Sequence, residues 1–142
     1  MGNKVIRLTA EIRTYAQKVA DVGSRMGVTS NKFGQVSKGI SPNLESISNA
    51  KRQYLSLLNE YQSQEETLNQ IKAPFELEKE HNKLLVSFKK FVDATNMGID
   101  ALDVDNIQVD EEQNNKCLQL QAEASKEIVI ITDEIAIRLG LK

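Results

Sequence analysis

The chain of 142 residues contains no tryptophan, two prolines and one cysteine, Cys117. A single cysteine excludes an intrachain disulfide and any metal site built from several cysteines. Aromatic residues make up only 5% of the chain, a composition that suits helices better than a β-sandwich. The length fits one domain, since single domains usually hold about 100–150 residues.

The chain also lacks a strong excess of either positive or negative charge. The chain has 18 basic and 20 acidic side chains, and no segment collects the excess of lysine and arginine that phosphate neutralisation needs. We therefore expect no nucleic-acid partner. No apolar run approaches the roughly 18 residues of a transmembrane segment, and no apolar signal segment follows the N-terminus, so the chain as written is predicted to be soluble and cytoplasmic.

What the chain has is helical periodicity, strongest from residue 44 to residue 102. Apolar side chains recur there in steps of three and four, which is the period of a helix and not of a strand. Ala73-Pro74 interrupts the pattern, because proline cannot donate the helical hydrogen bond and restricts the preceding residue. The junction is either a hairpin between two helices, predicted at 43–72 and 74–102, or a kink in one continuous helix.

Another helix is predicted at about 3–22, where a strict heptad stripe suggests a surface for self-association or a protein partner. The stripe consists of Val5, Leu8, Ile12, Tyr15, Val19 and Val22. Four glycines between residues 23 and 39 follow it, so a Gly/Ser-rich loop is predicted at about 27–41. This loop either binds a partner or simply crosses over to the next helix.

The remaining helix boundaries have capping signals. Ser41 is the predicted N-cap of the helix at 43–72, with Pro42 in its first turn. Asp110 is the predicted N-cap of a last helix at about 110–139, with Gln113 completing a capping box and Gly140 ending the helix. The β-branched run at 128–131 is interpreted as part of this helix with an unusually broad buried face. Gln64, a polar residue in the apolar stripe of the helix at 43–72, either fixes the register of the packed helices or lies at a solvent-accessible edge of the bundle.

Together these segments predict an all-α fold, an elongated up-and-down bundle of about four long amphipathic helices forming a single domain over residues 1–142. Catalytic and metal-binding patterns are incomplete. Glu78 and His81 have the Glu-x-x-His spacing of di-iron bundles, but His81 is the only histidine and the second motif is missing. Asp103 and Asp105 begin like a calcium loop that then loses its glycine and final glutamate. We expect no catalytic residue, metal or cofactor.

The first residues, Met1-Gly2-Asn3-Lys4, are similar to the mature start Cys-Gly-Asn-Lys of a bacterial lipoprotein, with methionine in place of the lipidated cysteine. With Pro74 followed by His81 and Leu84, the chain resembles small uncharacterised all-helical lipoproteins of Gram-positive bacteria. That resemblance implies an extracytoplasmic, membrane-anchored helical body and no known active site.

The sequence therefore predicts a non-enzymatic helical scaffold or protein–protein interaction module. The alternative is the body of an extracytoplasmic lipoprotein, and a third, minor possibility is a metal-binding helical bundle.

Overall fold

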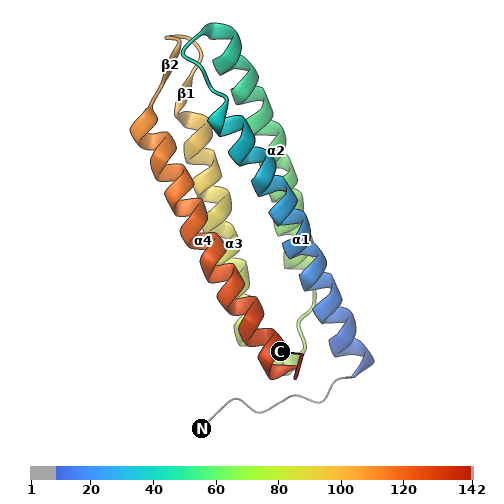
Figure 1. The fold of residues 1–142 in the computed structure, drawn as a ribbon. Coiled ribbons are helices and arrows are strands. Elements are labelled where there is room, and N and C mark those ends of the chain that lie inside the picture. The colour runs from blue at the N-terminus through green and yellow to red at the C-terminus, as the bar shows by residue number, and fades with distance from the viewer. Residues whose placement is uncertain (1–8, 142) are drawn as a thin grey trace.

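The computed structural model describes residues 9–141, and in this part of the chain four long helices alternate in direction (Figure 1). The helices are α1 (Ala10–Lys38), α2 (Leu44–Gln70), α3 (Glu78–Asp100) and α4 (Glu111–Arg138). A 3₁₀ turn, η1 (Phe75–Leu77), precedes α3, and a two-stranded hairpin, β1 (Leu102–Asp103) and β2 (Gln108–Val109), connects α3 to α4. The predicted elongated all-α up-and-down bundle is confirmed.

The predicted loop at 27–41 is wrong over most of its length, because α1 continues through it to Lys38. The three- and four-residue steps of the stripe persist past the glycines at Thr29 and Phe33, each 1% exposed. The Phe33 ring stacks on that of Tyr54 in α2, with 4.1 Å between centroids. Burial of such side chains outweighs a cost of about 1 kcal/mol for each helical glycine. The start predicted at residue 3 lies outside the described residues; within them, Thr9 is the N-cap.

The Ala73-Pro74 junction is a hairpin and not a kink. α2 ends at Gln70, the backbone of Ile71 is extended, and η1 then turns the chain into the antiparallel α3 (Figure 1). The N-cap of α2 is Asn43 and not the predicted Ser41, because the Asn43 side chain accepts from the Ser46 N–H at 2.8 Å.

The ends of α4 follow the sequence signals more closely. The Asp110 carboxylate caps the helix by accepting from the Gln113 N–H at 3.0 Å. The Gln113 side chain does not complete a capping box and instead donates to the Met97 carbonyl of α3 at 2.9 Å. Gly140 adopts a φ of 72° just after the helix, a conformation that glycine accepts without strain.

The β1–β2 hairpin was not predicted from the acidic, turn-rich sequence. Leu102 pairs with Val109 and Asp103 with Gln108. The Asp103 carboxylate accepts from the backbone N–H and the side-chain amide of Asn106, and these hydrogen bonds lower the pKa of Asp103. The carboxylate that begins the calcium-like pattern therefore stabilises a turn.

One continuous apolar core runs between the four helices, and the closest pair is α3 with α4. Their approach depends on Gly98, where an added Cβ would lie 2.6 Å from the Cys117 Sγ. The expectation of a broad buried face at 128–131 is wrong. Ile128 and Ile131 are buried, but Val129 and Ile130 are 55% and 53% exposed.

Candidate functional site

The predicted interaction stripe of α1 faces the inside of the bundle. Ile12, Tyr15, Val19 and Val22 are between 3% and 5% exposed, and all belong to the core. Val5 and Leu8 lie outside the described residues. Contact with a partner through this stripe would require α1 to separate from the other helices, so the stripe as an interaction surface stays a prediction.

Most polar side chains buried in the core are paired across helices. The Gln64 amide of α2 donates to the Thr29 hydroxyl of α1 at 2.9 Å, and the Gln121 amide of α4 donates to the Thr95 hydroxyl of α3 at the same distance. The Tyr54 hydroxyl donates to the Asn114 side chain at 3.3 Å. Gln64 thus lies in the core. The first two pairs join consecutive helices and the third joins α2 to α4, because buried polar groups need partners.

His81 is a hydrogen-bonded histidine in the core of the bundle. It is 5% exposed, and its Nδ1 lies 2.9 Å from the Tyr15 hydroxyl of α1. Burial disfavours the imidazolium and lowers the pKa of His81, an effect that the backbone carbonyl of Leu68 partly opposes. Glu78, its partner in the di-iron-like spacing, is exposed at the surface.

The lowered pKa of His81 predicts a pH-dependent stability. Below about pH 6.5, the ordinary value for histidine, the unfolded chain binds a proton that the folded chain resists, so the free energy of unfolding falls as the pH falls toward the folded pKa. Above pH 6.5 both states are neutral at His81 and the contribution is constant. We expect urea unfolding between about pH 5 and 8 to show this decline in the wild type.

His81→Gln is the matched variant, because glutamine retains hydrogen-bonding capacity but does not titrate. Its stability should differ from that of the wild type by no more than about 2 kcal/mol at pH 8, the scale of one buried hydrogen bond. It should also show a flatter pH profile. Parallel profiles for the two proteins would mean that His81 does not resist protonation in the fold.

The remaining candidate groups also have structural roles. Cys117 is fully buried, and burial raises the pKa of its thiol to about 11, so it stays protonated and unreactive at neutral pH. Glu80 forms an ion pair of 2.6 Å with Arg138. Within residues 9–141, no three side chains of histidine, cysteine, aspartate or glutamate gather in a way that would hold a metal ion. No helix in the same range combines the length and apolarity needed to cross a bilayer.

A groove of about 570 Å³ runs along the surface between α3 and α4, and we call it the α3–α4 groove. Its lining consists of Lys79, Asn82, Lys83, Val86, Ser87, Lys90, Glu127, Ile130 and Ile131. Val86 and Ile130 are 58% and 53% exposed, whereas Ile131 beneath them is buried. Exposed apolar side chains that continue into a buried floor and have a polar rim are typical of binding surfaces.

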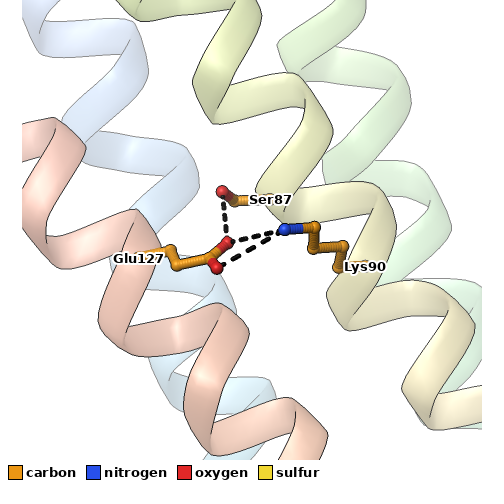
Figure 2. Close-up of polar contacts among 3 residues, drawn as sticks. All are labelled: Ser87, Lys90 and Glu127. Atoms are coloured by element: carbon orange, nitrogen blue, oxygen red, sulfur yellow. Dashed lines mark hydrogen bonds and ion pairs between the residues drawn. The ribbon is translucent and has the colours of Figure 1, made fainter.

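The two walls of the α3–α4 groove are joined by polar contacts around Glu127 (Figure 2). The Ser87 hydroxyl of α3 donates to the Glu127 carboxylate of α4 at 2.9 Å, and the Lys90 ammonium lies 3.4 Å from the same oxygen. Ser87 is buried, whereas the side chains of Lys90 and Glu127 are 59% and 44% exposed. An ion pair this exposed contributes about 0–1 kcal/mol, so Lys90 can exchange it for another carboxylate.

Sequence reasoning missed the α3–α4 groove. Val86 lies off the three- and four-residue stripe of α3, and Ile130 is one of four consecutive apolar residues. These departures from the core period were the available signal. The run at 128–131 was interpreted as a broad buried face, and Val86 was given no role. Comparison with protein families, curated proteins and solved structures finds no match to this chain.

Proposed function

We propose that this chain is a non-enzymatic protein–protein interaction module, in which the bundle is a rigid scaffold and the α3–α4 groove binds the partner. The observation that carries the proposal is the pair of exposed apolar side chains, Val86 and Ile130, above a buried floor. When a partner covers such a surface, the free energy of binding becomes more favourable by about 25 cal/mol per Å² of apolar area removed from water. The polar side chains of the core also support a non-enzymatic, scaffold role, because many of them form hydrogen bonds between helices.

The location of the protein does not alter the proposal. If the chain is cytoplasmic, the α3–α4 groove meets a cytoplasmic partner. If it is the body of an extracytoplasmic lipoprotein, the groove meets a partner outside the membrane. The residues that resemble a lipoprotein start, Met1 to Lys4, lie outside the described part of the chain.

Site-specific photocrosslinking tests the proposed function in cells that produce the protein. A benzophenone amino acid placed at Val86 or Ile130 should yield the same cross-linked protein, because both positions line one groove. Val28 is the matched control, since it is equally exposed at 59% but lies on α1. No adduct at positions 86 and 130, or the same adduct at all three positions, would contradict an interaction at the groove.

A further inference from the structure

The α3–α4 groove has an uneven charge. Its lining includes three lysines, Lys79, Lys83 and Lys90, but one carboxylate, Glu127. The groove therefore has an excess of two positive charges in a chain whose net charge is −2. Because the single carboxylate is already shared with Lys90 and Ser87, Lys79 and Lys83 have no acidic neighbour within the lining.

The lysines form a row along one wall. Lys79, Lys83, Val86 and Lys90 follow each other on α3 in steps of four, three and four residues, so they share one helical face. The row extends over about 16 Å at 1.5 Å per residue. On the α4 side, Ile130 lies in the opposite wall and Ile131 in the buried floor. The groove thus has a positive edge and an apolar centre, both parallel to the helix axes.

We infer that the α3–α4 groove binds an acidic amphipathic α-helix of a partner protein, an inference that rests on the proposed interaction function. A helix of about three turns matches the length of the lysine row. Its apolar residues at positions i, i+3, i+4 and i+7 contact Val86, Ile130 and Ile131. Glutamate or aspartate on one flank then faces Lys79, Lys83 and Lys90, which supplies orientation and excludes basic helices.

The charge pattern favours this occupant over others. A nucleic acid would leave the apolar centre of the groove without a matching surface. A membrane surface is better matched by basic and apolar side chains on a protruding face than by a groove between two helices. The acidic helix satisfies both the lysine row and the apolar centre.

Two designed peptides test the inference with the full-length protein. Both have the same leucine stripe, and their flanking positions are glutamate in one and lysine in the other. Fluorescence polarisation should show at least tenfold tighter binding of the glutamate peptide, and added salt should weaken that binding because exposed charges are screened. The double variant K79E/K83E should reverse the preference between the two peptides.

Apolar contact is tested separately by Val86→Asp and its control Val28→Asp. Both positions are exposed to nearly the same extent, so both variants should keep the circular dichroism spectrum of the wild type. We expect Val86→Asp to weaken binding of the glutamate peptide at least tenfold and Val28→Asp to leave it unchanged.

Several outcomes would overturn the acidic-helix inference: no binding of the glutamate peptide, equal binding of both peptides, or equal losses for the two aspartate variants. Stronger binding to anionic phosphatidylglycerol vesicles than to the peptide would assign the groove to a membrane surface. A wild-type dimer in light scattering that Val86→Asp dissociates would assign it to a second copy. Crosslinking of a partner at positions 86 and 130 would in each case leave the broader interaction function standing.

Discussion

Replacing Arg138 with methionine is expected to lower the free energy of unfolding by about 2–4 kcal/mol, because the change leaves the Glu80 carboxylate largely buried without its cation. Arg138 donates from Nη1 to Glu80 at 2.6 Å and to the backbone carbonyl of Glu76 at 2.8 Å. The two side chains are only 21% and 12% exposed, so water replaces little of the lost interaction. Urea unfolding at pH 7 measures the effect.

The double variant Glu80→Met/Arg138→Met provides the control. Removing both charges replaces the pair by apolar side chains of similar length, so we expect it to recover most of the stability lost in the single variant. A single variant within about 0.5 kcal/mol of the wild type would show instead that solvent already reaches the pair.

Gly98→Ala is expected to lower the free energy of unfolding by about 1–3 kcal/mol, since the new Cβ would lie 2.6 Å from the Cys117 Sγ of α4. Cys117 is fully buried, and Phe33 lies 3.4 Å from the same Cβ position, so the sulfur has little room to move. Thermal unfolding measures the loss. Cys117→Ala in the same chain removes the sulfur and should restore part of the stability.

Gly27→Ala is the matched change with the opposite expected sign. Nothing lies within 4 Å of a Cβ at Gly27, so alanine adds helix propensity without a clash and should stabilise the fold by about 0.5–1 kcal/mol. If both alanine variants shifted stability in the same direction, the close approach at Gly98 would not be what distinguishes them.

The buried stripes of the helices could be predicted from sequence, because the burial of one helix face makes apolar residues recur every three or four positions. α2, the body of α3 and α4 were found this way. α1 was cut short because its glycines were read as local punctuation, although Thr29 and Phe33 continued the stripe beyond them. Whether these residues are buried depends on α2 and on the Tyr54 ring in particular, which local propensity does not reveal.

Cross-helix partners could not be predicted. Tyr15 and His81 are 66 positions apart, and their contact requires both the hairpin at Pro74 and the relative heights of α1 and α3. The α3–α4 groove escaped prediction for a related reason. Ile130 looks like a core residue in sequence and Val86 lies off the core stripe of α3, but only the packing of the two helices shows that both side chains line one groove.

The buried polar pairs also bear on how uniquely the bundle is specified. Apolar stripes alone allow helices to slide past one another with little loss of burial. A shift of one turn would separate Gln64 from Thr29 and Gln121 from Thr95, leaving buried polar groups without partners. Each such group costs about 1–3 kcal/mol, so the pairs favour one alignment of the four helices.

The alternating order of the helices has a kinetic consequence. The closely packed helix pairs are consecutive in the chain, α1 with α2, α2 with α3 and α3 with α4, whereas α1 and α4 approach each other less closely. Chains whose contacts are mostly local cross their folding barrier on timescales of roughly microseconds to milliseconds, since little loop-closure entropy precedes the first stable contacts. Because the turn at Pro74 and the β1–β2 hairpin join consecutive helices, we expect these pairs to dock before α1 meets α4.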